Sequence, residues 1–216
     1  MPASCSTTYG APYITCLVDI QIDYARKKIN VQLYASDNII TGNDMYQMDI
    51  NGSFHQHNQT LAAELKYQCV FTDDCAKNYT RRIFPILLSH QTILHKIKDR
   101  VYNHNSSNVQ RCYDLQNKTI DCINGQCRAE VGIMSNPNDT YNPLPFYKTY
   151  CNYYPSEDPF HNATGFVGTY TYGVPPEFGV FNNLHFVCNR NLCNNNKNIK
   201  LIQNLVNDFN NFTTFK

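Results

Sequence analysis

The chain has 216 residues, a formal net charge of +1 and a charged fraction of 16%, below the roughly 25% usual for soluble globular proteins. So small a net charge argues against a surface that binds nucleic acid. The length allows one large domain or two of about 100 residues. No run of about 18 apolar residues occurs, so no segment is expected to span a membrane.

The first residues, "MPASCSTTYGAP", have no apolar core typical of a secretory signal, so the chain is expected to be a mature form or an excised fragment. Residues 16–35 predict a β-hairpin with one buried face, because apolar and polar side chains alternate on both sides of an "ARKK" turn. The expected inward side chains are Val18, Ile20, Ile22, Tyr24, Ile29, Val31 and Leu33. The "RKK" at 26–28 is an exposed hairpin tip in the simplest interpretation; contact with an acidic partner is the alternative.

Further strands are predicted along the chain. Residues 64–71, "ELKYQCVF", place Leu65, Tyr67, Cys69 and Phe71 on one side. The second half contains "CRAEVGIM", "YKTYCNYY", "GFVGTYTYG" and "LHFVC". The 16 tyrosines and 12 phenylalanines suit half-buried, pleated surfaces. The predicted fold class is therefore mainly β.

Two segments have helical spacing instead. Residues 83–102 place Ile83, Leu87, Leu94, Ile97 and Val101 on one stripe. Pro85 is tolerated only in a first helical turn, so this helix is expected to begin near it. Residues 198–209 place Ile199, Ile202, Leu205, Val206 and Phe209 on a second stripe. Both helices are expected to pack on the neighbouring sheet, and packing against a partner chain is the alternative.

The ten cysteines are expected to form a disulfide framework, because their number is even and the chain is rich in glycosylation sequons. They are Cys5, Cys16, Cys69, Cys75, Cys112, Cys122, Cys127, Cys151, Cys188 and Cys193. Structural zinc is the rival, but no C-x2-C pair occurs, and His55 and His57 lie more than ten residues from any cysteine. The "HQH" at 55–57 is interpreted as an exposed turn, with a weak metal site as the alternative. No C-x-x-C redox pair is present.

The cysteines also divide the chain into two similar halves. Each half opens with cysteines near its start and ends with a close pair, in "QCVFTDDCAKN" and "VCNRNLCNN", followed by a helical stretch. Such internal repetition predicts two tandem domains. The expected organisation is a first domain at 1–80, a helical linker at 81–104, a second domain at 105–196 and a C-terminal helix and tail at 197–216.

Eight N-x-[ST] sequons predict a glycosylated secretory product. Their asparagines are Asn51, Asn58, Asn78, Asn105, Asn117, Asn138, Asn162 and Asn211. With 28 asparagines and 25 serines and threonines in the chain, chance alone would give roughly three sequons. The alternative is that an Asn-rich chain has accumulated sequons by accident. Asn78 is the sequon least expected to be occupied, because it follows Cys75 by three residues in a turn that can be buried.

The second half resembles the LU domain, the three-finger fold of the urokinase receptor and lymphocyte surface antigens. The resemblance rests on a final cysteine pair four residues apart with an asparagine directly after it, in "CNRNLCN", and on "IDCINGQCRAEV". It implies Cys112–Cys127, Cys122–Cys151 and Cys188–Cys193 bridges, and it implies that the Asn194 side chain hydrogen-bonds to backbone near the base of the domain.

The first half resembles the family less closely. The resemblance there retains Cys5–Cys16 and Cys69–Cys75, while the middle bridge has no cysteines and Ala76 stands where the family has asparagine. The fold class implied for the whole chain is two small, disulfide-rich, three-finger antiparallel sheets, each followed by an amphipathic helix.

No catalytic motif is apparent: G-x-S-x-G, a Gly-rich phosphate loop and H-E-x-x-H are all missing, and the adjacent Asp73 and Asp74 are expected in a solvated loop. No cofactor is implied. The chain is expected to be an extracellular or cell-surface protein, without enzymatic activity, that contacts other proteins or copies of itself. A self-assembling fibre or coat protein is favoured; a receptor-like ectodomain for a separate protein ligand is the alternative, and an enzyme ranks third.

Overall fold

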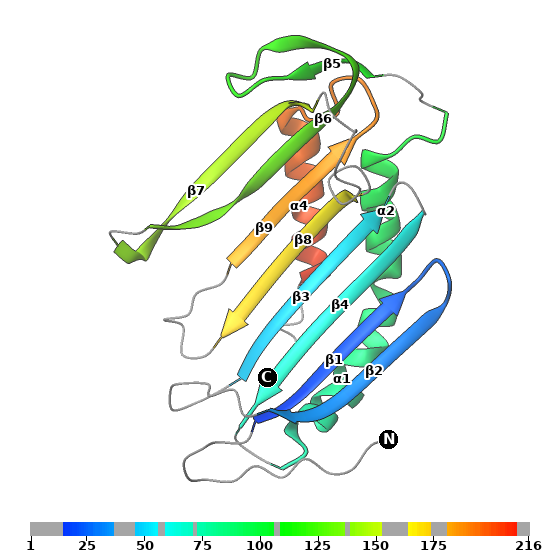
Figure 1. Ribbon diagram of the computed structural model, residues 1–216, viewed down its shortest axis with the longest axis vertical. Helices are drawn as coiled ribbons and strands as arrows, with labels where there is room; N and C mark the ends of the chain where they lie inside the picture. The colour runs from blue at the N-terminus through cyan, green and yellow to red at the C-terminus, as the bar shows by residue number, and fades with distance from the viewer. Residues whose placement is uncertain are drawn as a thin grey trace.

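The computed structural model describes residues 15–36, 46–55, 59–70, 73–105, 109–136, 139–152, 164–173 and 181–210. The strands in these ranges are β1 Thr15–Asp23, β2 Lys28–Ser36, β3 Tyr46–His55, β4 Thr60–Cys69, β5 Val109–Tyr113, β6 Thr119–Asn136, β7 Asp139–Asn152, β8 Thr164–Gly173 and β9 Phe181–Cys188. The helices are α1 Cys75–Ser89, α2 Gln91–Val101 and α4 Asn196–Asn210. Four strands and two helices are thus followed by five strands and one helix (Figure 1).

The strands form one antiparallel arrangement in the order β2-β1-β4-β3-β8-β9-β6-β5, with β7 also paired to β6 (Figure 1). The long β6 pairs with β5 through its first residues and with β7 and β9 beyond Gln126. The mainly β, disulfide-rich fold class is confirmed. The ladder between β3 and β8, from Gln47–Gly173 to His55–Thr164, crosses between the two predicted units. The strands of the two predicted units therefore follow one another in a single sheet order.

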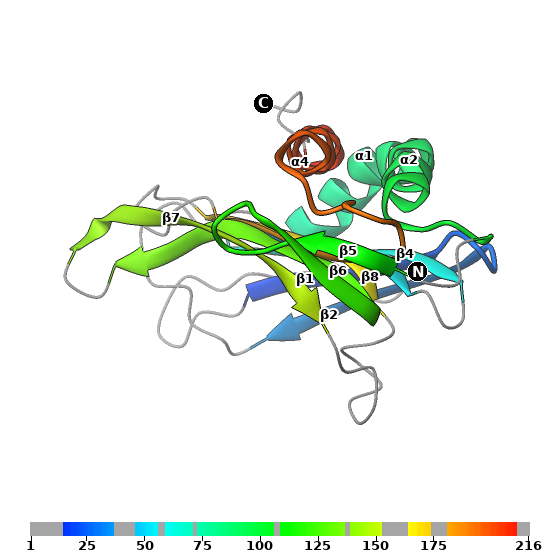
Figure 2. The same ribbon diagram turned by 90° about the horizontal axis from the view of Figure 1, so that it is seen from above.

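All three helices lie on one face of the sheet, as Figure 2 shows from above. The inward stripes predicted from the sequence are buried, apart from Leu205, which is partly buried against the core. They meet sheet residues such as Ile20, Ile50, Phe54 and Leu65, none of which is exposed. Helices α2 and α4 also lie side by side (Figures 1 and 2). One core therefore lies between the sheet and the helix layer. Of the two alternatives for the helices, the structure has them packed on the sheet.

The predicted hairpin is present as β1 and β2, but the expectation that all its apolar side chains face a core is wrong for β2. Ile29 and Val31 are 48% and 38% exposed, although they lie opposite the buried Ile22 and Ile20. The physical reason is position: β2 is the last strand at its edge of the sheet, and the helices pack over the strands further in.

The expectation that a helix begins near Pro85 is also wrong. Helix α1 begins at Cys75, immediately after Asp74 in a left-handed conformation (φ 55°), and Pro85 lies inside it. Pro85 is exposed, so water can bond the carbonyl that loses its partner to the missing proline N–H. The break comes at His90 instead, between α1 and α2, where the Nδ1–H donates to the Phe209 carbonyl of α4 (2.9 Å).

A glycine allows the helices to approach the middle of the sheet. A Cβ atom on Gly52 of β3 would lie 3.0 Å from Leu94 Cδ2 of α2 and 3.1 Å from Phe209 Cε1 of α4. Gly52 is paired across the β3–β8 ladder with Gly168. The absence of a side chain here lets both helices cover the junction between the two halves closely.

We predict that Gly52→Val lowers the free energy of unfolding by about 1–3 kcal/mol, because the new side chain overpacks against Leu94 and Phe209. Urea unfolding of the disulfide-intact protein measures the change. The matched control is Ser53→Val, which places the same side chain on the opposite face of β3 and should change stability little. Equal effects of the two substitutions would contradict the close approach at Gly52.

Candidate functional site

The cysteines of the second half and Asn194, which the resemblance singles out, lie where β5, β6 and β9 meet the start of α4. The structure has all three bridges that the resemblance implies, with Cα–Cα distances of 5.3 Å for Cys112–Cys127, 5.6 Å for Cys122–Cys151 and 6.3 Å for Cys188–Cys193. In the first half, Cys69–Cys75 is bridged with a Cα–Cα distance of 6.3 Å. Cys16 is disulfide-bonded as well, and its expected partner Cys5 lies outside the described residues.

Two of these bridges lie close to each other, and a glycine packs against one of them. The sulfur atoms of Cys112, Cys122 and Cys151 lie within 4.8 Å of one another, yet each belongs to a disulfide and so cannot act as a zinc-binding thiolate. A Cβ atom on Gly125 would lie 2.6 Å from Cys122 Sγ and 2.8 Å from Cys151 Sγ. Only glycine fits against the Cys122–Cys151 bridge at this point.

Asn194 makes the backbone contacts that the resemblance implies. Its side chain is fully buried. The Oδ1 atom accepts a hydrogen bond from the Tyr113 N–H (2.9 Å), and Nδ2 donates to the carbonyls of Tyr113 (2.9 Å) and Arg128 (3.2 Å). One amide therefore satisfies backbone groups of β5 and β6 together and holds both strands against the start of α4.

Two more asparagines of the same segment bond to backbone in a similar way. Asn189 exchanges two hydrogen bonds with the backbone of Asn103, through Oδ1 (2.7 Å) and Nδ2 (2.8 Å). The Oδ1 atom of Asn191 accepts from the N–H groups of Gln110 (2.6 Å) and Arg111 (3.1 Å). These bonds attach the end of β9 to the chain after α2 and to β5.

The start of α4 is capped by the remaining asparagines of this segment. Asn195 Oδ1 accepts from the Asn198 N–H (2.8 Å), the side-chain cap that a helix N-terminus requires. Asn198 Nδ2 in turn donates to the Cys193 carbonyl (2.6 Å). Sequence reasoning identified Asn194 and missed the others. The signal for them is the density of asparagine after Cys188 in "CNRNLCNNNKN".

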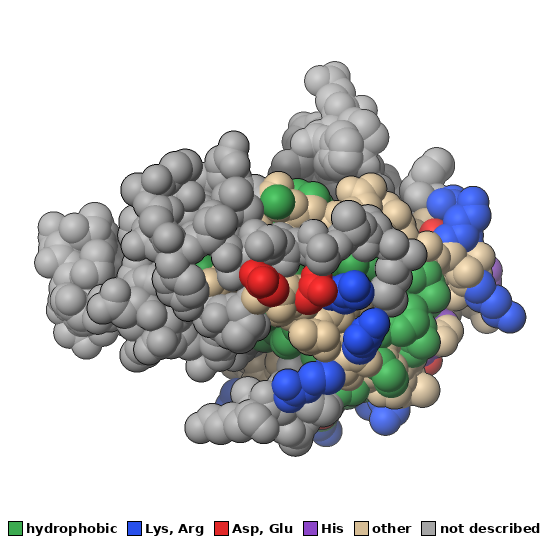
Figure 3. Space-filling view, turned by 90° about the horizontal axis from the view of Figure 1, so that it is seen from below, with side chains coloured by type: hydrophobic (Ala, Val, Ile, Leu, Met, Phe, Trp, Pro, Cys, Tyr) green, Lys and Arg blue, Asp and Glu red, His purple; other side chains and the backbone are tan. Residues whose placement is uncertain are grey.

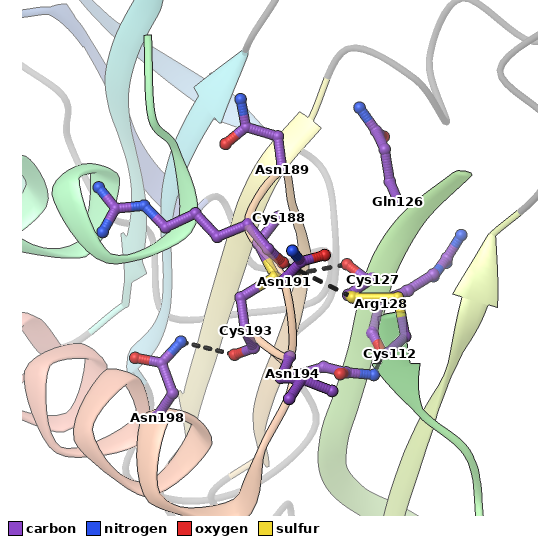
Figure 4. The surroundings of a disulfide bond; sticks show 12 residues. Cys112, Gln126, Cys127, Arg128, Cys188, Asn189, Asn191, Cys193, Asn194 and Asn198 are labelled. Atoms are coloured by element: carbon purple, nitrogen blue, oxygen red, sulfur yellow. Dashed lines mark hydrogen bonds between the residues drawn. A yellow bond between two sulfur atoms is a disulfide. The ribbon is translucent and has the colours of Figure 1, made fainter. Parts of the chain in front are cut away.

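We call residues 188–198 the closing segment; Figure 4 shows its asparagines around the Cys188–Cys193 bridge, with Cys112–Cys127 beside it. The side chains that make the bonds of Asn189, Asn191, Asn194, Asn195 and Asn198 are neutral amides, and the cysteines of the described residues are all in disulfides. Neutral amides neither transfer protons at ordinary pH nor act as nucleophiles. The arrangement can join β5, β6, β9 and α4 to one another and to the chain after α2.

A charged cluster lies around Glu130 on the sheet face that the helices leave open. Glu130 Oε1 lies 2.8 Å from Arg128 Nη2 and accepts a hydrogen bond from the Tyr150 hydroxyl (2.8 Å). Burial acts to raise the pKa of Glu130, but the hydrogen bond from Tyr150 and the charges of Arg128, His185 and Lys148 together lower this pKa overall. Burial and the bond to Glu130 raise the pKa of Tyr150 to about 12. A carboxylate held ionised in this way is a poor general base.

The open face also has a groove of about 680 Å³ near the tip of the β1–β2 hairpin. Its lining mixes polar residues, among them Asp23, Lys28, Asn51 and Glu64, with the apolar Ile22, Ile29, Ala62 and Ala63. Arg26 of the predicted basic tip lies in the adjacent turn and pairs with Asp23 (3.5 Å). The groove therefore offers both polar and apolar contacts, and it contains one of the predicted glycosylation sites.

Four of the eight sequon asparagines are described. Asn78 in α1, Asn105 after α2 and Asn117 in the β5–β6 turn are exposed, and the expectation of a buried turn at Asn78 is wrong because the residue lies on the solvent side of α1. Asn51 is half-buried in β3, and its Oδ1 is buried with no hydrogen-bond partner among the described residues. Asn58, Asn138, Asn162 and Asn211 lie outside the described residues.

The remaining candidates are scattered. His55 ends β3, and His57 lies outside the described residues, as does Phe71. Asp74, expected in a solvated loop beside Asp73, precedes α1 and pairs with Lys77 (3.7 Å). In the part of the chain that the structure describes, no helix is long and apolar enough to cross a bilayer.

Comparison of the chain with protein-family models, with curated proteins and with solved structures finds no match.

We predict that Asn194→Ala lowers the free energy of unfolding by about 1–3 kcal/mol, because the backbone groups of Tyr113 and Arg128 lose a buried partner. Thermal or urea unfolding under oxidising conditions measures the loss. Asn204→Ala, an exposed position on α4, is the matched control and should leave stability nearly unchanged. A stability loss no larger than the control's would show that Asn194 does not hold the strands.

The lowered pKa of Glu130 predicts a pH dependence. Below the ordinary glutamate pKa of 4.5, the unfolded chain takes up a proton that the folded chain still excludes, so the unfolding free energy falls as the pH falls. Tyr150→Phe keeps the ring under Arg128 and removes the donor to Glu130, so its acid loss should be shallower than that of the wild type. Urea unfolding across a pH series compares the two slopes, and equal slopes would contradict this role of the Tyr150 hydroxyl.

Proposed function

We propose that this chain is a non-catalytic, N-glycosylated extracellular protein that works through contacts with other proteins and with copies of itself. The observation that carries the proposal is the closing segment, in which disulfides and neutral amides join β5, β6, β9 and α4. The disulfides are typical of an oxidising, extracellular-type environment. The sequons at exposed turns supply sites for the glycans that would keep a weakly charged chain soluble.

We also propose that each half is a divergent three-finger domain of the LU type. In the second half, the β5–β6 pair and the β6–β7 hairpin are tied at the bridges of Cys112 and Cys122, and β9 ends at Cys188. This arrangement and the bonds of Asn194 support the family. The first half supports it less, with β1–β2 and β3–β4 as two paired hairpins and the bridge at Cys69 as its closing pair.

Assembly into a fibre or cell-surface coat is the version we favour. The support is an edge strand, β2, that exposes apolar side chains although it belongs to a stable hairpin. A receptor-like ectodomain is the second candidate, favoured by the groove near the β1–β2 tip. The two differ in behaviour: an assembling protein associates when purified alone, whereas a receptor stays monomeric until its protein ligand is added.

We predict that the chain carries N-glycans when it is made by a eukaryotic secretory host, so its intact mass exceeds the 24.9 kDa of the polypeptide. Peptide mapping should find Asn78, Asn105 and Asn117 occupied and Asn51 unoccupied, because Asn51 is half-buried in a central strand. Thr119→Ala removes the sequon of Asn117 and should lower the mass by one glycan.

A bare mass of 24.9 kDa for the secreted protein, or free thiols in it, would contradict the proposed function. An occupied Asn51 would contradict only its burial in the folded chain, and it would fill the groove with sugar and so remove the case for a receptor.

A further inference from the structure

Among the residues that the structure describes, no segment pairs with the outer edge of β2. Within the described residues β2 pairs only with β1, in a continuous register from Thr15–Ser36 to Asp23–Lys28 without a bulge. Its nine residues, "KINVQLYAS", contain no proline. Natural edge strands are normally protected by proline, bulges, charge or a covering segment, because their free N–H and C=O groups can accept another strand. In β2 only Lys28 offers such protection.

The opposite end of the sheet is protected. The outer strand β7 contains Pro143 and Pro145, which have no N–H to donate to a neighbouring strand. The other outer strand, β5, has only five residues and an irregular register at Val109–Arg111. The two ends therefore differ, and head-to-tail addition of strands from copy to copy is disfavoured at this end.

The side chains of β2 are apolar on the face shared with the helices. Ile29, Val31 and Leu33 lie opposite Ile22, Ile20 and Val18 of β1, whose side chains are buried beneath the helix layer. Ile29 and Val31 are exposed, and Leu33 is partly buried against the core. Viewed from the end of the molecule at which β2 lies, hydrophobic side chains reach the surface beside lysines and arginines (Figure 3).

The charge of this edge favours association between like copies. Lys28 is the only charged residue of β2, and Asp23 lies directly across from it in the β1–β2 register. Asp23 also pairs with Arg26 of the turn (3.5 Å). From Ile29 to Ser36 the strand carries no charged side chain, so two copies can meet along it without strong repulsion, and a strongly acidic or basic partner would find little to bind there.

We propose that β2 pairs antiparallel with β2 of a second copy of this chain, about a two-fold axis at Val31; the proposal rests on the self-association in the proposed function. In this register Val31 meets Val31 of the second copy, and Ile29 meets its Leu33, so the apolar stripe is continuous across the junction. Asn30 then meets Gln32, and Lys28 meets Tyr34, which keeps the two basic hairpin tips at opposite ends.

The two-fold axis is perpendicular to the joined sheet, so the helices of both copies lie on the same face and the exposed apolar side chains of both copies share one side. A register centred on Gln32 would place Ile29 against Ala35 and cover less apolar surface. Because the same edge is used by both copies, the contact is isologous and closes as a dimer. The dimer is then the unit from which any larger assembly is built.

Charge exchange at Val31 tests both the contact and its register. In the proposed dimer, Val31→Lys brings two lysines together at the axis and Val31→Glu brings two glutamates together. Each variant alone should raise the dimer dissociation constant at least about a hundredfold. An equimolar mixture should dimerise again, because lysine then meets glutamate. Sedimentation velocity of the full glycosylated chains across a concentration series measures all three.

Matched controls separate this contact from folding and from general stickiness. Ile123→Lys removes an exposed apolar side chain of β6, 66% exposed, and should leave the dimer intact. Far-ultraviolet circular dichroism and thermal unfolding should show that the Val31 variants fold.

Three outcomes would overturn the proposal: a wild-type monomer at every concentration, association unaffected by Val31→Lys, or variants that stay apart when mixed. None of these outcomes touches the glycans and disulfides that test the proposed function. Conversely, the secreted chain could carry no glycans and still form the dimer as expected. That result would support the β2 contact and contradict the proposed glycoprotein.

Discussion

The ladder between β3 and β8 is the constraint on which the rest of the structure depends. Each half of the chain alone has a small, one-sided sheet that can bury little apolar surface. Pairing β3 with β8 joins the two sheets edge to edge, so that α1, α2 and α4 can cover them as a single layer. At Gly52 of this ladder, which is paired with Gly168, Leu94 of α2 and Phe209 of α4 approach the sheet closely.

The same ladder decides which edges of the sheet remain. Because β3 and β8 pair with each other, neither is an edge strand. The edge strands are β2 at one end of the sheet and β5 and β7 at the other. The helix layer is centred over the joined strands, so the apolar side of β2 reaches solvent beyond it. The β1–β2 register is regular, so a slipped register does not explain the exposure of Ile29 and Val31. Their exposure follows from the position of β2 at the edge of the joined sheet.

Asparagine has two roles in this chain, and both suit its low charge. At exposed turns it supplies sequons. In the closing segment its amide provides a donor and an acceptor at once, which satisfies paired backbone groups without burying an ion. Asn189 and Asn194 use the amide in this way, and the Oδ1 atom of Asn191 accepts from two backbone N–H groups. A carboxylate at these positions could bond only donors and an ammonium group only acceptors, and the desolvation of either charge would oppose folding.

Local order and covalent chemistry were accessible from the sequence alone. Alternation predicted β1, β2 and β4, helical spacing predicted the inward stripes of α1, α2 and α4, and the resemblance implied three bridges and the contacts of Asn194. These features depend on residues near one another in the chain or on a strongly patterned set of cysteines. Pro85 misled the prediction of the start of α1, because its solvent exposure inside the helix is a property of packing.

Only the tertiary structure decided how the halves meet. The pairing of β3 with β8 joins segments more than a hundred residues apart, and no alternation within either strand names its neighbour. For the same reason the exposure of Ile29 and Val31, the close approach at Gly52, the further backbone bonds of Asn189 and Asn191 and the Glu130–Tyr150 contact followed from the assembled sheet. The sequence by itself determined which surfaces of each element are apolar and which cysteines are close in the chain, whereas long-range packing determined which of those surfaces are covered.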